Sequence, residues 1–547
     1  MVRRSIFYLP EVLTRAEVLA LIILAAIALM SLLGMTGKLI QMNGIEQPAF
    51  GGTLREGIVG NPRFINPIFA QTDADRDLVS LVYAGLMAYD EEGNLTDRLS
   101  ESHEISASGL TYTFILKKNL RWSDGQKFTA DDVLFTVELA KNPSVQSPRR
   151  ANWEGVEISK TDDRTVVFEL KKAYAPFMDN LTLGILPKHV WGSVPASQIS
   201  IVDINTNPVG AGPYKINSEK RNSLGSITEI SLETNKYFAE RKPNIKNFDV
   251  KFYEKEKDAV DALQKGMIDS LGAISPEYVG GLTNKKLTVK TVDLQRVIAV
   301  FLNKDAKKSL ASAGVRKALN LGTDKKALVE KILKNYGETI NGPIPFLASS
   351  SENANDSYDP DAARELLKKY KGNVEITLTT ATAPELVKTA KMLQEMWSKI
   401  GIKVDVKTFN LDNLEQSVIG PRRYDAFIYG EEVVGKNPDL FAFWHSSQRA
   451  HPGYNIALYA NSKTDKLLES VRSEQDPKKS LKLYQDIQKE IEKDMPAIFL
   501  FSPHYIYAVP KNLKGLNTNS INTGSERFSM VHKWYLNSNY VWKIFAE

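Results

Sequence analysis

The residue types that most often perform chemistry form no familiar motif in this chain. It contains six histidines among 547 residues, and no two of them lie four residues apart with a Glu between, the helical pattern that binds zinc. The phosphate-cradling G-x-x-x-x-G-K-[ST] loop and the G-x-S-x-G turn of serine hydrolases do not occur. His445 and His451 flank a short loop, and a metal site there is a minor alternative to ordinary surface or core histidines. We therefore predict no metal and no cofactor, while an enzyme assembled from distant residues stays open.

Composition narrows the class of protein further. The length suggests two to four domains, and an apolar fraction of 43% is enough for a large core. The net charge of +5 is small against 70 basic and 65 acidic residues, and no basic stripe interleaved with aromatics appears, so we expect no nucleic-acid partner. The chain has no cysteine, which excludes disulfides, thiolate metal sites, a cysteine nucleophile and a lipid-modified N-terminal cysteine. The absence of cysteine does not indicate a compartment.

The N-terminal segment is typical of a membrane anchor. Val18–Met35 is an uncharged apolar run, about long enough to cross a ~30 Å hydrocarbon core as a helix. Three arginines precede it and Lys38 is the only basic residue shortly after it, which places the N-terminus in the cytoplasm. A cleaved signal peptide is the alternative, but the run is long for one and no clear A-x-A site follows. We therefore expect a cytoplasmic tail at 1–16, a transmembrane signal anchor at 17–36 and a linker at 37–50.

The stretch Arg121–Ala140 carries the clearest local structure. Asp124 and Gly125 favour a tight hairpin turn, and Thr129 with Asp132 form a capping-box pattern at the start of an amphipathic helix. This pattern is typical of a structural corner between strand and helix.

Longer patterns predict two kinds of region. Alternation in residues such as 111–116 and 166–170 predicts a β-rich region near 85–200 with helices packed on it. After about residue 300, long helices alternate with strands, which favours an α/β lobe with a mixed sheet. The expected helices are 75–88, 255–265, 312–321, 324–335, 360–370, 384–400, 463–473 and 477–494, and the later strands are 374–380, 402–408, 424–429 and 496–509. The last forty residues are expected to return to an earlier lobe.

Six segments, taken in order, resemble the family 5 extracellular solute-binding proteins of ABC transporters, the family of oligopeptide, dipeptide and nickel binders. Each segment alone is a weak marker, but their shared order across nearly 400 residues is specific. The segments are LVYAGLMAYDEEGNL at 81–95, RLSESHEISASGLTYTFILKKNLRWSDGQKFTADDV at 98–133, NPVGAGPYKI at 207–216, GVRKALNLGTDKKAL at 314–328, YDPDAARELLKKY at 358–370 and YNIALYANSKTDKLL at 454–468.

The resemblance implies an α/β fold of the periplasmic-binding-protein type (class II, cluster C), with two lobes, an extra β-rich domain and one preceding transmembrane helix. Ligand would lie between the lobes, which close around it by a hinge, and a membrane permease would recognise the closed form. The implied divisions are lobe I at 51–84 and 205–298, β-rich domain II at 85–204, lobe III at 299–505 and a C-terminal return to lobe I at 506–547.

The resemblance also implies two groups of ligand-binding residues. Gln71, Thr72 and Asp73 occupy positions that touch the ligand backbone in oligopeptide binders. A helix N-cap is the alternative for this segment, and the two roles can coexist. Asn455 matches a loop that lines the cleft, with a turn residue as its alternative.

The second group lies between Tyr429 and Trp444, where the chain departs from peptide binders. Gly430 and Pro438 fit the family pattern, but Glu431 stands at the position of a Trp, and Val434 at the position of the acid that receives a peptide's N-terminal ammonium. Glu431 and Glu432 are candidates to replace that acid, and solvated loop charges are the equal alternative. Further candidates near the crossover between lobes are Phe501, His504 and Tyr505.

From these observations we expect a membrane-tethered binding protein, outside the cytoplasm at the cell surface or in a periplasm. It would deliver oligopeptides or similar small solutes to the permease subunits of an ABC importer, and act as a monomer. A receptor for a peptide signal, a metal chelate or an oligosaccharide is the alternative within the same fold. A hydrolase using carboxylates such as Asp73, Glu431 or Glu432 is a remote one.

Overall fold

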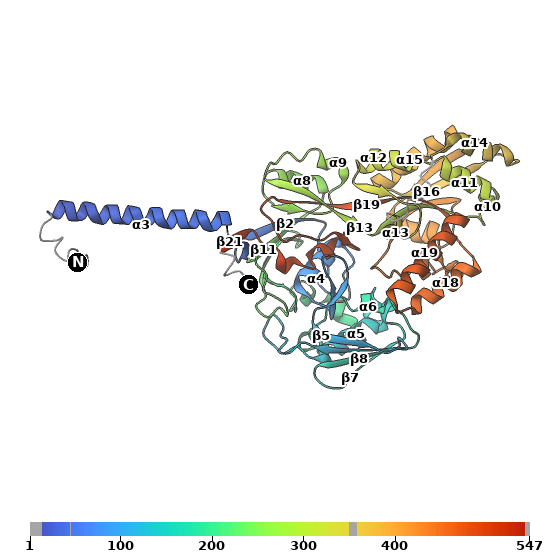
Figure 1. The fold of residues 1–547 in the computed structure, drawn as a ribbon. Coiled ribbons are helices and arrows are strands. Elements are labelled where there is room, and N and C mark those ends of the chain that lie inside the picture. Colours follow the sequence, from blue (N-terminus) through green and yellow to red (C-terminus); the bar gives the residue numbers. More distant parts are fainter. Residues whose placement is uncertain (1–13, 44, 349–357, 542–547) are drawn as a thin grey trace.

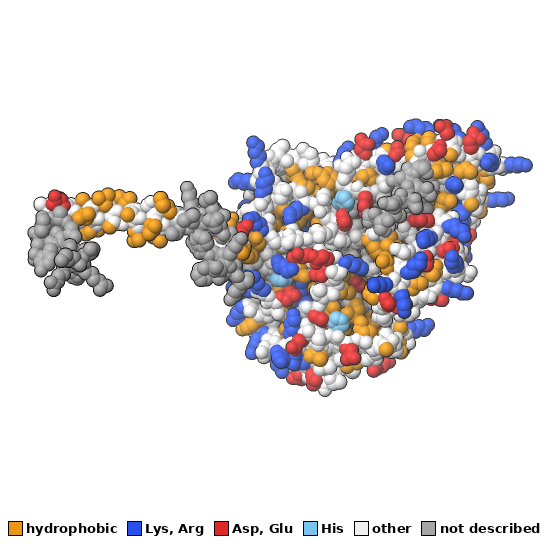
Figure 2. All heavy atoms as spheres, in the orientation of Figure 1, with side chains coloured by type: hydrophobic (Ala, Val, Ile, Leu, Met, Phe, Trp, Pro, Cys, Tyr) orange, Lys and Arg blue, Asp and Glu red, His pale blue; other side chains and the backbone are white. Residues whose placement is uncertain are grey.

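The computed structural model describes residues 14–43, 45–348 and 358–541 (Figure 1). Helix α3 (Arg15–Asn43) projects from the folded body, and its segment Ala16–Leu33 is apolar and long enough to cross a membrane. In Figure 2 the side chains along this helix are mainly apolar, whereas acidic and basic side chains are interspersed over the visible face of the body. Most of the predicted cytoplasmic tail, residues 1–13, lies outside the described residues.

Residues 37–50, for which a linker is expected, contain the end of a helix and a strand. Helix α3 continues to Asn43, and strand β1 (Ile45–Ala49) pairs antiparallel with β21 (Asn537–Val541) near the other end of the chain. Pro48 is tolerated because this pair is a separate two-stranded sheet, in which a missing N–H interrupts no central ladder. The partner of β1 lies nearly 500 residues away, so no local pattern indicated a strand.

One large sheet runs through both lobes. Strand β19 (Ala497–Pro510) pairs with β14 (Arg296–Leu302) near its start and with β13 (Leu287–Leu294) along its second half, so it connects the lobes. The pairing changes between Phe501, opposite Ile298, and His504, opposite Asp293. On the lobe I side the sheet contains β2 (Thr53–Val59), β9 (Tyr214–Arg221), β10 (Ile227–Thr234), β11 (Asn247–Tyr253), β12 (Ser270–Leu271) and β20 (Ser520–Ile521), and on the lobe III side β15 (Gly337–Thr339), β16 (Glu375–Ala381), β17 (Lys403–Phe409) and β18 (Ala426–Glu432).

The lobe after residue 300 has helices that begin and end close to the predicted positions. Asp359 caps α14 by accepting a hydrogen bond from the Ala362 amide at 2.8 Å, and Pro360 occupies the first turn. Two apolar cores lie in this lobe. Its helices are α10 (Lys308–Ala311), α11 (Ala313–Leu321), α12 (Lys325–Leu333), α13 (Pro345–Ala348), α14 (Pro360–Lys369), α15 (Pro384–Lys399), α16 (Leu411–Leu414), α17 (Phe441–Trp444), α18 (Ser462–Ser473) and α19 (Pro477–Asp494).

The β-rich region is a four-stranded antiparallel sheet covered by α5 (Ala130–Lys141). Its strand order is β5 (Ser100–Ile105), β6 (Thr111–Leu116), β8 (Thr165–Leu170) and β7 (Val156–Lys160). The predicted corner is confirmed: Gly125 has φ +93°, and the Asp132 carboxylate accepts a hydrogen bond from the Thr129 amide at 2.8 Å. Short helices α6 (Phe177–Asn180) and α7 (Lys188–Trp191) complete this region.

The helix predicted at 75–88 is shorter and shifted. Helix α4 spans Asp73–Val82, and the chain then becomes extended before β3 (Met87–Tyr89), which pairs with β4 (Leu95–Asp97). A Cβ atom at Gly85 would come within 2.6–2.7 Å of the backbone carbonyls of Leu181 and Thr182. Close packing against this neighbouring segment therefore overrides the helical pattern.

The C-terminal segment contacts elements from the beginning of the folded body. The short helix η8 (Gly524–Phe528) packs against α4, and it brings the buried side chain of Arg527 to Glu56 and Asp77. The Arg527 guanidinium lies 3.0 Å from the Glu56 carboxylate and 2.6 Å from the Asp77 carboxylate. Helices α8 (Glu256–Gln264) and α9 (Pro276–Val279) complete lobe I.

Candidate ligand-binding cleft

A cleft of about 1730 Å³ lies where the lobes and the β-rich region meet. Its wall contains the end of β18 and the loop that follows it, together with the crossover part of β19. The β-rich region contributes residues 170–180 from the opposite side. Concave sites of this kind, with a few polar groups among apolar ones, are typical of ligand binding.

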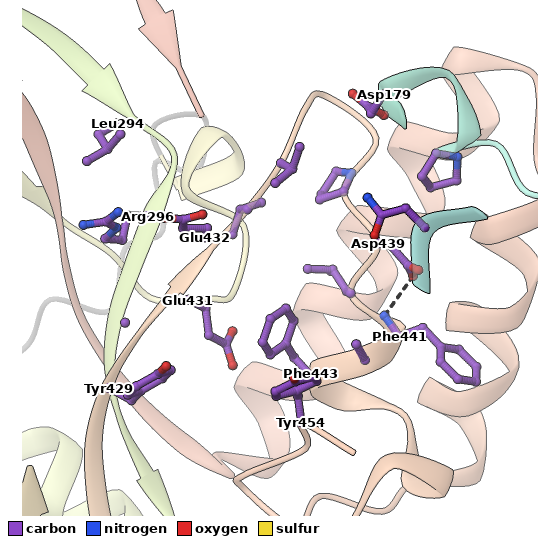
Figure 3. Close-up of a pocket in the computed structure, with 18 of the residues that line it drawn as sticks. Asp179, Leu294, Arg296, Tyr429, Glu431, Glu432, Asp439, Phe441, Phe443 and Tyr454 are labelled. Carbon is purple, nitrogen blue, oxygen red and sulfur yellow. Dashed lines mark hydrogen bonds and ion pairs between the residues drawn. The ribbon is translucent and has the colours of Figure 1, made fainter. Parts of the chain in front are cut away.

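Glu431 is the most unusual residue of this wall. Its side chain points into the cleft beside Tyr429, Phe443 and Tyr454 (Figure 3). Glu431 is only 2% exposed, and its Oε1 atom has no hydrogen-bond partner among the described residues. Burial raises the pKa of this carboxyl to about 8, because no neighbouring donor compensates for the lost water. With a pKa of about 8, the carboxyl of Glu431 is therefore largely neutral at pH 7.

Glu432 differs from Glu431 in both partner and exposure. Successive side chains of a strand point to opposite faces, so the two neighbours enter different surroundings. The Glu432 carboxylate is half-exposed and lies 2.8 Å from the Arg296 guanidinium on the adjacent strand β14 (Figure 3). Sequence reasoning treated the two acids as equivalent candidates, and the structure separates them.

Aromatic side chains form much of the surface facing Glu431. Tyr429, Phe441, Phe443 and Tyr454 all line the cleft, and Tyr454 is 57% exposed. Sequence reasoning did not select Phe441, Phe443 or Tyr454. The dense aromatic run LFAFW at 440–444 was the available signal.

The structure brings about half of the predicted site residues together. Those that line the cleft are Gly430, Glu431, Glu432, Phe501, His504 and Tyr505. Val434, at the position of the missing family acid, also lines the cleft and is 43% exposed.

The remaining predicted site residues do not line the cleft in this conformation, and most have a structural role. Gln71 and Asp73 are exposed beside Thr72, which caps α4 by accepting a hydrogen bond from the Asp75 amide at 3.1 Å. Asn455 is buried and its amide nitrogen donates hydrogen bonds to the carbonyls of His445 and Tyr459. Trp444 is fully buried and packs in the core at tilted or edge-on angles against the rings of Phe301, Tyr459 and Phe499.

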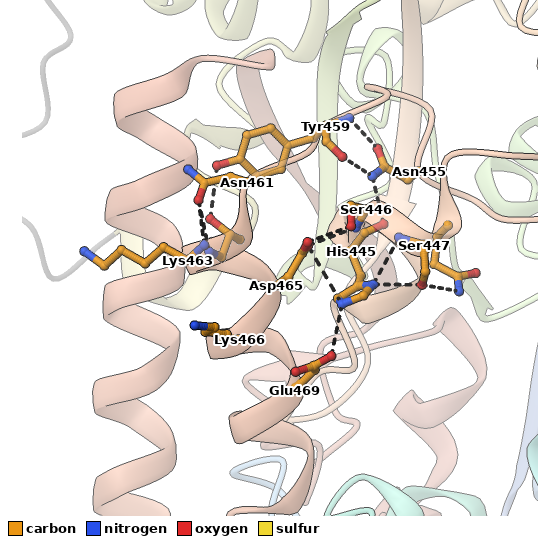
Figure 4. A network of polar contacts seen from close by, with 12 residues as sticks. His445, Ser446, Ser447, Asn455, Tyr459, Asn461, Lys463, Asp465, Lys466 and Glu469 are labelled. Atoms are coloured by element: carbon orange, nitrogen blue, oxygen red, sulfur yellow. Dashed lines mark hydrogen bonds and ion pairs between the residues drawn. The ribbon is translucent and has the colours of Figure 1, made fainter.

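The loop after Trp444 is held by polar contacts within the protein (Figure 4). His445 Nδ1 accepts a hydrogen bond from the Ser447 amide at 3.1 Å, and Nε2 lies 3.5 Å from the Glu469 carboxylate. His451 lies instead near Glu415, at 3.9 Å. Within residues 14–43, 45–348 and 358–541, no group of three or more His, Cys, Asp or Glu has the arrangement of a metal site.

Several contacts join the β-rich region to the opposite wall. The Tyr174 hydroxyl donates a hydrogen bond to the Asp439 carboxylate at 3.0 Å, and Arg472 lies 3.2 Å from the same carboxylate. The Ala175 amide donates to the Arg472 carbonyl at 2.6 Å. These contacts hold the two sides of the cleft close together.

Comparison with known proteins identifies the family. Residues 94–464 match the family described as bacterial extracellular solute-binding proteins, family 5. The chain belongs to this family. The expected fold class, a two-lobe α/β fold with an N-terminal apolar helix, is confirmed. In this fold the cleft lies between the two lobes.

The similarity to individual relatives extends over nearly the whole length of this chain. The oligopeptide-binding protein AppA of Bacillus subtilis is 28% identical over 515 residues, 90% of this chain and 92% of AppA. The AppA structure with a nonapeptide has a TM-score of 0.70 at 27% identity, covering 90% of this chain and 100% of that one. NikZ of Campylobacter jejuni, in complex with Ni(L-His), has a TM-score of 0.71 at 26% identity, with 88% and 99% covered. The ABC transporter substrate-binding protein CtaP of Listeria monocytogenes has a TM-score of 0.77 at 26% identity, with 89% and 99% covered.

Proposed function

We propose that this protein captures oligopeptides outside the cytoplasm and presents them to the permease subunits of an ABC importer. The cleft of about 1730 Å³ supports a ligand larger than a typical drug-sized molecule, whose pockets span about 300–1,000 Å³. The similarity to AppA, which holds a nonapeptide, supports the same ligand class. Each chain carries a complete cleft, so we propose that it acts as a monomer.

The observation that carries this proposal is the buried, unpaired carboxyl of Glu431. A carboxyl without a partner inside a ligand cleft gains most from a ligand that supplies positively charged N–H donors. A peptide's N-terminal ammonium supplies such donors, and we assign Glu431 to receive it. The aromatic side chains of Tyr429, Phe443 and Tyr454 would pack against the ligand's first residues.

Native mass spectrometry of the protein purified without added ligand tests this function directly. We expect bound species whose masses and fragmentation are those of short peptides, lost on mild unfolding. A bound nickel complex would favour the alternative suggested by the similarity to NikZ, and a bound oligosaccharide would also contradict the peptide proposal.

We further propose that the protein does not turn its ligand over. Recovered peptides should have unchanged masses after prolonged incubation with excess protein. Cleaved products that disappear when Glu431 is changed to Gln would instead support the hydrolase alternative.

The N-terminal helix gives a separate prediction about location. If α3 remains as an anchor, the mature protein keeps residues 1–15 and sediments with membranes, because inserting an 18-residue, mainly apolar helical segment into lipid is effectively irreversible. Intact mass and membrane fractionation measure both properties. A soluble protein whose N-terminus lies near residue 36 would show that the helix is a cleaved signal.

A further inference from the structure

The end of lobe I that adjoins α3 carries a group of exposed cations and apolar side chains. Strands β11 and β21 lie where α3 meets the folded body (Figure 1). The loop that joins β10 to β11 packs against the segment directly after β1, where the Gly51 amide donates a hydrogen bond to the Asn244 carbonyl at 2.8 Å. We define the basal surface as six exposed residues at this end of the body: Ile45, Phe50, Arg241, Lys242, Lys246 and Tyr540.

The three cations of the basal surface have no carboxylate partner in the part of the chain that the structure describes. The acidic residue of their own loop, Glu240, is engaged elsewhere, since its carboxylate lies 3.6 Å from Arg98 and 3.4 Å from His532. The acid on β1, Glu46, pairs with Lys514 at 2.6 Å, and β21 contains no acid. The positive charge of the basal surface is therefore available to an external anion.

Apolar side chains are exposed beside these cations. Phe50 is 51% exposed, and the Lys242 ammonium lies 4.1 Å from the centre of its ring. Ile45 and Tyr540 are exposed on β1 and β21. Aromatic rings are enriched at the boundary between a membrane and water, and basic side chains are attracted to anionic headgroups. The composition of the basal surface therefore suits the headgroup layer of a bilayer.

Helix α3 determines how far this surface lies from a bilayer. If Ala16–Leu33 spans the hydrocarbon core, residues 34–43 continue the helix for about 15 Å before β1 begins. The headgroup layer is roughly 5–8 Å thick on each side, so an upright helix leaves about 10 Å between it and β1, and a tilted helix leaves less. This distance is about one Debye length at physiological ionic strength, so charges on the basal surface interact with the headgroups.

We propose that the basal surface rests on the bilayer, with Arg241, Lys242 and Lys246 against the phosphates of anionic lipids and with Phe50 and Tyr540 in the headgroup layer. The inference rests on the proposed retention of α3 as an anchor and goes beyond it. The helix alone ties the body to the membrane, whereas contact between the basal surface and the headgroups fixes the orientation of the body.

Fluorescence quenching by lipid headgroups tests this contact. The chain has no cysteine, so one introduced cysteine can carry a single label. Full-length protein with Asn539→Cys on β21 is inserted through α3 into nanodiscs that contain lipids with a quencher on the headgroup. We expect about twofold more quenching in discs that contain phosphatidylglycerol than in discs of phosphatidylcholine alone, because only the former are anionic. A label at Ser398→Cys on α15, far from α3 in Figure 1, should not respond to lipid charge.

The variant Arg241→Glu/Lys246→Glu should lose the additional quenching in anionic discs, because the basal surface then carries a net negative charge. The matched control Lys326→Glu/Lys371→Glu reverses two exposed cations of lobe III and should retain the response of the wild-type protein. All four positions are exposed, so both variants should keep the wild-type melting temperature. Added salt should weaken the wild-type response, because salt screens charges at a surface.

Failure of this contact and failure of the anchor give different results. Equal quenching in both kinds of disc, or a lipid dependence that survives in Arg241→Glu/Lys246→Glu, would overturn the contact while leaving the anchor intact. Protein that washes off the discs would overturn the anchor and the contact together. Peptide binding, measured on the same preparations, reports on the proposed function separately from both.

Discussion

Replacing Glu431 with Gln is expected to stabilise the ligand-free protein at pH 8 and to weaken peptide binding more than tenfold. Burial raises the pKa of Glu431 from its ordinary value of 4.5 to about 8. Between these values the unfolded chain releases the proton and the folded chain keeps it, so stability falls as pH rises through this window. Each unit of the difference corresponds to about 1.4 kcal/mol, and the total cost at pH 8 is on the order of several kcal/mol.

Chemical unfolding at pH 4 and pH 8 measures the stability part of this prediction. The variant and the wild-type protein should be equally stable at pH 4, where the carboxyl is protonated in both states. At pH 8 the variant should be the more stable, because Gln carries no charge to bury. An equal effect at both pH values would show that burial of the carboxyl is not the cause.

Calorimetry measures the binding part. Loss of more than tenfold in affinity corresponds to more than about 1.4 kcal/mol. The ammonium group of the ligand should favour the ionised form of Glu431, so the carboxyl should release up to one proton when the ligand binds at pH 7. The measured binding enthalpy should therefore depend on the ionisation enthalpy of the buffer. Glu432→Gln is the matched control, since its half-exposed carboxylate pairs with Arg296, and it should change affinity less. Unchanged affinity in Glu431→Gln/Glu432→Gln would reject a role for either acid.

Replacing Arg527 with Met is expected to destabilise the fold by about 3–5 kcal/mol, because it leaves two buried carboxylates without their cation. Arg527 and Glu56 have side chains that are 3% and 0% exposed, and Asp77 is 5% exposed. Burial raises the pKa of Asp77 to about 6 even with the arginine present. The loss should therefore be smaller near pH 4, where Asp77 in the folded variant binds a proton and carries no buried charge.

Urea unfolding followed by tryptophan fluorescence measures this loss. Arg527→Met/Glu56→Gln/Asp77→Asn should recover part of it, because no charge remains buried. The exposed Arg150→Met is the control for removing an arginine and should change stability little. A triple variant less stable than Arg527→Met would show that packing, rather than charge, sets the loss.

The parts of the fold that could be predicted depend on local signals. Asp359 and Pro360 start α14, and Asp124 and Gly125 form their turn, because caps and turns are determined by a few adjacent residues. The pairing of β1 and the early end of α4 depend on contacts with segments far away in the sequence. Neighbouring residues therefore do not predict them. The predictions from sequence therefore differ from the structure where contacts between distant segments determine the local conformation.

In the candidate site too, some features could be predicted from adjacent residues and others could not. The sequence indicated Glu431 and Glu432, but it placed the end of their strand at residue 429 rather than at Glu432. Extending the strand by three residues would have put Glu431 on the same face as Tyr429, with Glu432 on the other.

The pairing of β1 with β21 has a consequence for where the folded body would lie if α3 stays in the bilayer. With α3 in the bilayer, residues 34–43 form a helical stalk of ~15 Å, and a single residue separates it from β1. If α3 is retained as an anchor, so short a stalk would confine the body to a thin layer above the membrane, where a membrane-bound partner would be met by lateral diffusion at a high effective concentration. The described C-terminal strand ends beside β1, so a reporter fused there would sample this same layer.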